Sequence, residues 1–231
     1  MSETVDPGVL YIVSTPIGNL DDITLRAIKV LGGVDLIAAE DTRKTKFLLD
    51  HLSITKPLLS YYSYNEARRV TDLIKLLREG KSVAVVTDAG TPGISDPAYV
   101  LIVDAIRNGV RVIPIPGASA MLPALIVSGL PTNRFVFEGF LPVKKGRKST
   151  FERLRSEERT IVIYESPFRI IKTVEEALEH FGKGRRMAVV REITKKFEET
   201  IRGTGAEILE QLKKKAPRGE YVLVVEGAQS P

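Results

Sequence analysis

Polar and glycine-rich segments follow several short apolar runs in the N-terminal half of this chain, and their residue types suit the binding of a small polar ligand. These segments are residues 14–19, 40–43, 64–66, 88–93 and 116–119. Glycine lets backbone amides approach a ligand closely, while neighbouring hydroxyl and carboxylate groups can hold ribose hydroxyls or an amino acid group. No segment has the phosphate-binding form G-x-x-x-x-G-K-[ST] or G-x-G-x-x-G. We expect a nucleotide-like ligand, although segment 88–93 alone is equally typical of a turn.

Two adjacent acids, Glu40 and Asp41, stand at the end of one of these apolar runs. A carboxylate beside a weakly acidic hydroxyl can accept its proton while the oxygen attacks an electrophile, so this pair suits a general base or a ribose-binding group. The structural alternative is that both acids begin a helix and offset its dipole. The residues themselves support the two interpretations equally.

Two charged segments in the C-terminal half also follow apolar runs, at residues 164–169 (Tyr-Glu-Ser-Pro-Phe-Arg) and 191–196 (Arg-Glu-Ile-Thr-Lys-Lys). We interpret both as site loops. Charged residues at a strand end can equally form a structural Arg–Glu pair, which stabilises little when exposed. Residues 203–205 (Gly-Thr-Gly) leave three alternatives open: a hinge, a helix cap, or a close backbone approach to a ligand.

The elements that must position these segments alternate along the first half. Apolar runs predict strands at residues 9–13, 34–39, 57–62, 82–87 and 110–115. Helical periodicity predicts helices between them, the first capped by Asp21 or Asp22. This alternation predicts a mostly parallel sheet covered on both faces, and such sheets bind ligands outside the carboxyl ends of their strands.

The pattern breaks near Pro116 and Gly117, so we expect an N-terminal domain over 1–116 and a C-terminal domain over 117–231. The second half mixes strands and helices in a way that favours an α/β domain with some antiparallel pairing. Its strands are predicted near 134–138, 160–164, 186–191 and 221–225, and its helices near 120–127, 169–181 and 206–215. Residues 144–148 are predicted to be a mobile loop.

Composition limits the partners and the kinds of reaction that we expect for this chain. The 231 residues carry a net charge of +5, and Lys and Arg concentrate in segments 144–159 and 213–218. These segments predict a basic face for RNA, or equally a set of solvated surface charges. Without cysteine, and with His51 and His180 far apart in sequence, thiol chemistry and a metal site are not expected. A polar N-terminus and no apolar run of ~18 residues predict a cytoplasmic protein outside the membrane.

Five motifs taken together resemble one family. They are residues 14–20, 39–43, 88–92, 164–167 and 191–195. In this order and spacing they resemble the bacterial ribosomal RNA small subunit methyltransferase I family of the tetrapyrrole methylase superfamily. The resemblance runs from about Val9 to Gly227, nearly the whole chain. One departure is Tyr64, which stands where many relatives have a histidine.

The resemblance implies a class III S-adenosylmethionine-dependent methyltransferase: a homodimer of two α/β domains, the first with a mostly parallel sheet and the second with a mixed sheet. It implies S-adenosylmethionine in the cleft between the domains and methyl transfer to the 2′-oxygen of a cytidine in the decoding region of 16S ribosomal RNA. The cofactor-binding residues that it implies are Pro16, Asp88, Ala89, Gly90, Thr91, Ile94, Ser119, Ala120, Tyr164, Glu165 and Gly203.

For that reaction we expect Glu40 or Asp41 as the base or ribose anchor, because methyl transfer needs an aligned acceptor and a proton acceptor. Three further residues are expected to orient the acceptor nucleotide: Asn65, Glu66 and Lys195. Three tyrosines are candidates to stack on a flipped base, although core packing is the more common role of aromatic residues near a strand end: Tyr61, Tyr62 and Tyr64.

Two other functions fit the same residues. A tetrapyrrole C-methyltransferase would also attract an acidic substrate with basic residues, but the form of residues 88–92 resembles the RNA branch of the superfamily. A non-catalytic module that binds S-adenosylmethionine and regulates a partner would show cofactor binding without turnover.

Overall fold

The computed structural model describes residues 5–61 and 66–228, without the side chains of residues 66–68. The chain divides into two units, Met1–Ser119 and Ala120–Pro231. The change of pattern near Pro116 lies shortly before this division. Within the described ranges, no helix combines the length and the apolar character needed to cross a bilayer.

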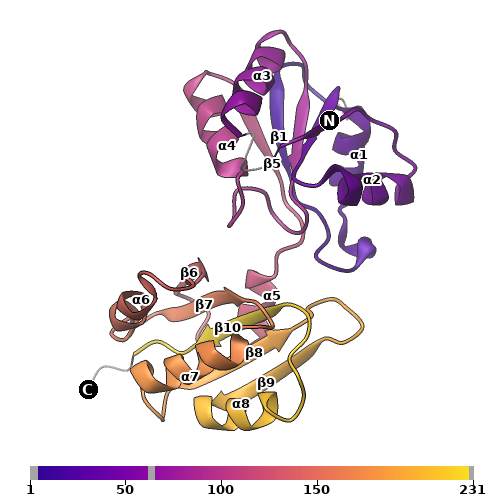
Figure 1. The fold of residues 1–231 in the computed structure, drawn as a ribbon. Helices are drawn as coiled ribbons and strands as arrows, with labels where there is room; N and C mark the ends of the chain where they lie inside the picture. Colours follow the sequence, from indigo (N-terminus) through magenta and orange to yellow (C-terminus); the bar gives the residue numbers. More distant parts are fainter. Residues whose placement is uncertain (1–4, 62–65, 229–231) are drawn as a thin grey trace. The chain divides into compact units, whose positions relative to one another are not determined.

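The first unit contains a five-stranded sheet with the order β3-β2-β4-β1-β5 (Figure 1). Its strands are β1 (Val9–Val13), β2 (Leu36–Ala39), β3 (Leu58–Ser60), β4 (Val83–Val86) and β5 (Arg111–Ile115). All four neighbouring pairs are parallel, as the alternation of strands and helices predicted. Every strand therefore ends at the same edge of the sheet.

Helices cover both faces of this sheet. They are α1 (Leu25–Gly33), α2 (Thr42–His51), α3 (Glu66–Arg78) and α4 (Ala98–Arg107). Figure 1 shows α1 and α2 on one side and α3 and α4 on the other. Alternate residues of β1 serve the two cores: Tyr11 packs in the cluster with α1, and Leu10 in the cluster with α3 and α4. This double coverage explains why β1 is a continuous apolar run rather than an alternating one.

The start of α1 differs from the prediction. Thr24, rather than Asp21 or Asp22, is its N-cap, and the Thr24 hydroxyl accepts a hydrogen bond from the Ala27 amide. The two acids belong to a short 3-10 turn, Leu20–Asp22, which precedes the helix. A threonine satisfies the free amides of a helix start nearly as well as an aspartate does, so composition alone did not separate the candidates.

The second unit contains a mixed five-stranded sheet with the order β6-β7-β10-β8-β9. Its strands are β6 (Phe135–Phe140), β7 (Thr160–Glu165), β8 (Arg186–Arg191), β9 (Glu199–Thr204) and β10 (Tyr221–Val225). The β6–β7 pair is parallel and the other pairs are antiparallel. The sequence did not predict β9, because this edge strand buries a single apolar side chain, Ile201.

The helices of the second unit are α5 (Met121–Val127), α6 (Arg147–Leu154), α7 (Ile170–Phe181) and α8 (Gly205–Leu212). Helices α6, α7 and α8 contribute to the core on one face of the sheet, and α5 to the core on the other. Helix α6 was not predicted, because Phe151 and Leu154 are its only two apolar residues. The prediction of a mobile loop over 144–148 is therefore wrong for its last two residues, since Arg147 begins α6 and is buried.

Candidate functional site

The carboxyl edge of the parallel sheet gathers the polar segments of the first unit. The loops after β1 and β4 are joined by a pair of backbone hydrogen bonds between Thr15 and Gly90, with N–O distances of 2.9 and 3.0 Å. The Thr15 hydroxyl also donates to the Thr87 carbonyl oxygen. Gly90 has φ of +86°, a conformation that glycine adopts without strain. These contacts hold the two loops in one arrangement.

The loop after β5 joins the same group. The Thr91 hydroxyl lies 2.9 Å from the Ser14 hydroxyl and 3.3 Å from the Ala118 carbonyl oxygen. A side chain on Gly117 would place its Cβ only 2.9 Å from the Ser14 Cβ, so this close approach requires glycine. The structure therefore brings the loops after β1, β4 and β5 together. These loops contain six of the predicted cofactor-binding residues: Pro16, Asp88, Ala89, Gly90, Thr91 and Ser119.

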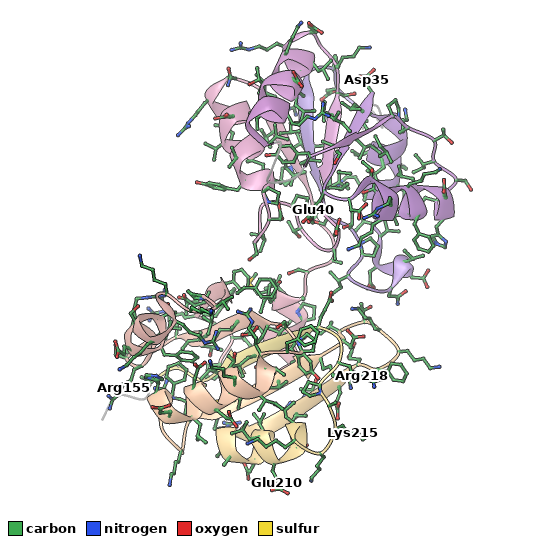
Figure 2. The ribbon with its side chains drawn as sticks, viewed as in Figure 1. Asp35, Glu40, Arg155, Glu210, Lys215 and Arg218 are labelled. Atoms are coloured by element: carbon green, nitrogen blue, oxygen red, sulfur yellow. The ribbon has the colours of Figure 1, made fainter. Side chains whose placement is uncertain are left out.

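Glu40 lies at this edge, directly after β2, whereas Asp35 lies at the opposite end of the unit (Figure 2). One Glu40 oxygen, Oε2, accepts hydrogen bonds from the Thr87 hydroxyl at 2.6 Å and from the Asp88 amide at 3.2 Å. Within residues 5–61 and 66–228, no donor hydrogen-bonds to the other oxygen, Oε1. The carboxylate is thus fixed in orientation by one oxygen and can interact through the second.

Asp41 has a different environment from its neighbour. It is the N-cap of α2, and both of its carboxyl oxygens bind the Arg43 side chain. The hydrogen bonds from Arg43 hold the pKa of Asp41 well below its ordinary value. Since a carboxylate with a lowered pKa is a weak proton acceptor, the geometry favours the helix-start interpretation for Asp41 and leaves Glu40 as the better-placed candidate for the predicted base.

Tyr61 is a core residue. Its side chain is 2% exposed, and its hydroxyl donates to the Pro97 carbonyl oxygen at 3.1 Å. The core interpretation is therefore confirmed for Tyr61. Tyr62, Tyr64 and Asn65 lie outside the described residues, and Glu66 begins α3 with a side chain that is not described.

In the second unit, Glu165 is the centre of a buried charged cluster. Its carboxylate accepts hydrogen bonds from the Thr173 hydroxyl and forms an ion pair with Arg169, each at 2.7 Å. Arg147 lies 3.9 Å away and binds both Thr173 and Glu176. Glu165 and Arg147 are only 2% and 5% exposed. The alternative of a structural Arg–Glu pair is therefore correct for the Glu165 side chain. Because this pair is buried, removing one partner would be costly.

Tyr164, the neighbour of Glu165, is half-buried and lies edge-on to the Phe137 and Phe140 rings, at centroid distances of 4.8 and 5.7 Å. The predicted residue Gly203 lies at the end of β9, next to Thr204. Thr204 and Glu207 form a capping box at the start of α8, which confirms the cap among the three alternatives for residues 203–205.

Lys195 lies in the loop after β8, where its ammonium group contacts Glu192 and Glu220 at 3.0 and 2.9 Å. Burial acts to lower the pKa of Lys195, but the hydrogen bonds that its ammonium group donates to both carboxylates outweigh burial and raise the pKa. The side chain is therefore a cation at neutral pH, suited to orienting a polar group rather than to accepting a proton. Glu192 and Thr194 have φ of +51° and +69°, which is strained for these residue types.

The predicted basic face is weaker than the sequence suggests. Within segment 144–159, several cations are ion-paired: Arg147 with Glu176, Lys148 with Glu152, Arg153 with Glu138, and Arg159 with Glu157. In the second basic segment, Lys213 and Lys214 also pair with glutamates. Much of the positive charge is therefore neutralised locally.

Two residues that support the site were not identified from the sequence. Thr87 orients Glu40, and Asp96 accepts hydrogen bonds from the Gly93 and Ala98 amides, which fixes the loop before α4. Burial raises the pKa of Asp96, although these amides act against it. The only signal for Thr87 and Asp96 in the sequence was that each is a polar residue next to a buried strand or a turn. Ile94, in the same loop, is exposed.

A surface depression of about 380 Å³ lies between α3 and α4. It reaches Arg78 and Asn108, which precede β4 and β5, so it lies toward the amino ends of the strands. Because ligands of parallel sheets bind at the carboxyl ends, we place the candidate site at the loops and not in this depression.

The comparisons with known proteins agree with this fold. The model of the tetrapyrrole (corrin/porphyrin) methylase family matches residues 9–209. A crystal structure of uroporphyrin-III C-methyltransferase from Thermus thermophilus, complexed with S-adenyl homocysteine, has a TM-score of 0.65 at 19% identity, covering 94% of this chain and 96% of that chain. At this identity the likeness concerns the fold alone.

Two curated relatives are much more similar in sequence. Ribosomal RNA small subunit methyltransferase I from Synechocystis is 48% identical over 96% of this chain and 80% of its own length. The protein of the same name from Thermotoga maritima is 47% identical over 96% of this chain and 100% of its own length. The chain therefore belongs to the ribosomal RNA small subunit methyltransferase I family, within the tetrapyrrole methylases.

Replacing Arg43 with alanine should raise the pKa of Asp41 toward the ordinary aspartate value of about 4, because the hydrogen bonds that stabilise the carboxylate are lost. The measurement is an NMR titration of the carboxyl carbons. Glu157 is the internal control, since the hydrogen bonds that Arg159 donates to its carboxylate lower its pKa to about 2 and are expected to do so in both proteins. An unchanged Asp41 pKa would contradict this account of its environment.

Replacing Glu165 with glutamine should lower the free energy of unfolding by about 3 kcal/mol, because Arg147 and Arg169 would lose their buried counter-charge. Denaturant titration measures the change. The matched control is Glu175→Gln, which removes the exposed partner of Lys213 and should cost less than about 1 kcal/mol. Equal losses in the two variants would show that burial does not strengthen the cluster.

Proposed function

We propose that this chain transfers a methyl group from S-adenosylmethionine to the ribosomal RNA of the small subunit. The observation that carries this proposal is the 47–48% identity, over 96% of the chain, to enzymes named ribosomal RNA small subunit methyltransferase I. The acceptor that we propose is the 2′-oxygen of a cytidine in the decoding region of 16S ribosomal RNA. It is supported by the five motifs that resemble this family.

The first-unit loops fit a ligand such as S-adenosylmethionine. This cofactor has ribose and amino acid groups but no phosphate, and the joined loops offer the Thr91 hydroxyl and backbone groups around Gly90 without a phosphate-binding motif. When bound, its sulfonium supplies an electrophilic methyl group. We propose Pro16, Ala89, Gly90, Thr91 and neighbouring loop residues as its contacts in the first unit.

In the second unit we propose cofactor contacts from Tyr164, the backbone at Glu165, and Gly203. The Glu165 side chain holds Arg147, Arg169 and Thr173, so its contribution to binding would be to position the loop. Ile94, Ser119 and Ala120 complete the proposed set, as the family resemblance implies.

We propose Glu40 as the proton acceptor. Its orientation is fixed through Oε2, and its other oxygen can receive the proton that the ribose hydroxyl loses during attack. Asp41 would position α2, and Lys195, with Asn65 and Glu66, would orient the acceptor nucleotide. Because methyl transfer is an in-line displacement, alignment of donor and acceptor is expected to supply much of the rate.

We also propose that the active enzyme is a homodimer, as the resemblance implies. Exposed apolar side chains on α4 and α5 give faces that a second copy would cover. They include Tyr99, Ile106, Leu122 and Ile126. Apolar patches of this kind on a folded protein are typical of protein interfaces.

The proposed function is tested by incubating the protein with methyl-labelled S-adenosylmethionine and small ribosomal subunits that lack the modification. We expect label on a single cytidine ribose, located by nuclease mapping. Methylation of a porphyrinoid substrate instead would identify a tetrapyrrole methyltransferase. Cofactor binding without transfer to any subunit would identify a regulatory module.

Replacing Glu40 with glutamine should lower the rate of methyl transfer by about 100-fold or more while the dissociation constant for S-adenosylmethionine changes little, because only the proton acceptor is lost. The comparison is Asp41→Asn, in which asparagine still caps α2, and which should retain most activity. Asp35→Asn, at the opposite end of the sheet, is the control for the loss of a carboxylate outside the proposed site, and it should not lower the rate of methyl transfer. Full activity of Glu40→Gln would remove Glu40 from this role.

A further inference from the structure

We propose that the loops after β6 and β7 form a surface that binds single-stranded RNA. In this surface, Phe140 and Phe168 stack on unpaired bases, and Lys144 and Lys145 contact phosphates. We call these four residues the aromatic–lysine surface. The proposal rests on the proposed function and deepens it, because it names the residues of the second unit that hold the RNA.

The first observation is the exposure of the two aromatic rings. Phe168 is 95% exposed and Phe140 is 54% exposed, and the adjacent Val143 is also exposed. Phe168 projects from a turn in which the Arg169 and Ile170 amides both donate to the Ser166 carbonyl oxygen. A large apolar side chain on a fixed turn loses little entropy on binding, so it suits a contact with a partner.

A β-bulge in β6 determines the face of the sheet on which Phe140 lies. Phe137 pairs with Val162 and Gly139 with Ile163, so Glu138 is the additional residue and Phe140 lies opposite Tyr164. If the same residues paired regularly, without a bulge, Phe140 would lie opposite Glu165 and point to the other face, because side chains alternate along a strand. Gly139 has φ of +62°, a conformation suited to glycine. The bulge thus places Phe140 beside Tyr164, a proposed cofactor contact.

The buried charged cluster holds the two loops together. Arg169 donates to the Leu141 carbonyl oxygen at 3.1 Å, and Arg147 donates to the Pro142 carbonyl oxygen at 3.2 Å. Both guanidinium groups are held by Glu165 and its neighbours. Since β6 and β7 are parallel, their following loops also leave the sheet at one edge. The cluster therefore fixes the backbone from which Phe140 and Lys144 project.

The charges on this surface favour a polyanion. Unlike the paired cations of segment 144–159, Lys144 and Lys145 have no acidic side chain within 4.0 Å among the described residues. They stand in the loop between Phe140 and α6, so aromatic and cationic groups follow one another along the chain. Single-stranded RNA presents both phosphates and exposed base faces, whereas the bases of a duplex are stacked on one another. We therefore choose single-stranded RNA over duplex RNA or an apolar protein face.

The test uses the full chain and a fluorescein-labelled single-stranded RNA of mixed sequence, with fluorescence anisotropy as the readout. Phe168→Ala should weaken binding about tenfold, and Phe140→Ala by a similar factor, without changing the dependence of affinity on salt concentration. The double variant Lys144→Ala, Lys145→Ala should reduce the slope of log affinity against log salt by about 1.4, since each phosphate contact on a single strand contributes about 0.7. The matched control is Phe47→Ala, which truncates an exposed phenylalanine on α2.

Three measurements separate the possible outcomes. Thermal unfolding should be unchanged in Phe168→Ala, whose ring makes almost no packing contact, so its RNA affinity is interpretable even if Phe140→Ala is less stable. Duplex RNA of the same sequence should bind all phenylalanine variants equally. Sedimentation should be unaltered, because a shift to a lower oligomeric state with intact RNA affinity would assign the surface to a second copy and overturn the proposal.

The aromatic–lysine surface and the proposed function fail in different ways. If the wild-type chain methylates ribosomal RNA but Phe168→Ala and Phe140→Ala bind single-stranded RNA as tightly as wild type, the surface is wrong and the function stands. If the wild-type chain transfers no methyl group to ribosomal RNA, the function is wrong. Cofactor affinity, measured by calorimetry, should be the same as wild type in Phe168→Ala and in the double lysine variant, neither of which removes the ring that contacts Tyr164.

Discussion

The parallel register of the first sheet is the constraint on which the candidate site depends. Because all five strands run in one direction, the loops after β1, β2, β4 and β5 leave at one edge. The paired backbone hydrogen bonds between Thr15 and Gly90 then fix two of these loops against each other, and Thr91 adds the loop after β5. A ligand at this edge would meet groups that are already in place, which lowers the entropy lost on binding.

The second unit fixes its loops by a different means. Its sheet is mixed, so fewer loops share an edge, and a buried cluster of charges around Glu165 provides the connection instead. Two arginines of this cluster bind backbone carbonyl oxygens of the β6–α6 loop. The same residues that resemble a family motif therefore have a structural task, and they also determine where the exposed rings of Phe140 and Phe168 can meet a partner.

Glu40 and Asp41 show how environment separates two adjacent acids. Asp41 binds Arg43 through both oxygens and caps a helix, whereas Glu40 keeps one oxygen without a donor among the described residues. The threonine that orients Glu40 directly follows β4, a neighbouring strand far away in the sequence. Division of roles between such a pair is a property of the folded sheet, since the isolated residue types are nearly equivalent in acidity.

From the sequence alone, apolar periodicity predicted most helices and strands, including β1. The alternation of strands and helices predicted that the first sheet is mostly parallel, and five motifs indicated the family. The sequence did not predict β9 or α6, because an edge strand and a helix with few apolar residues have little periodicity. Nor did it show that Thr24 caps α1 or that most of the basic segment is ion-paired. Capping and pairing depend on distances between side chains that are remote or interchangeable in the sequence, so only the tertiary structure decided them.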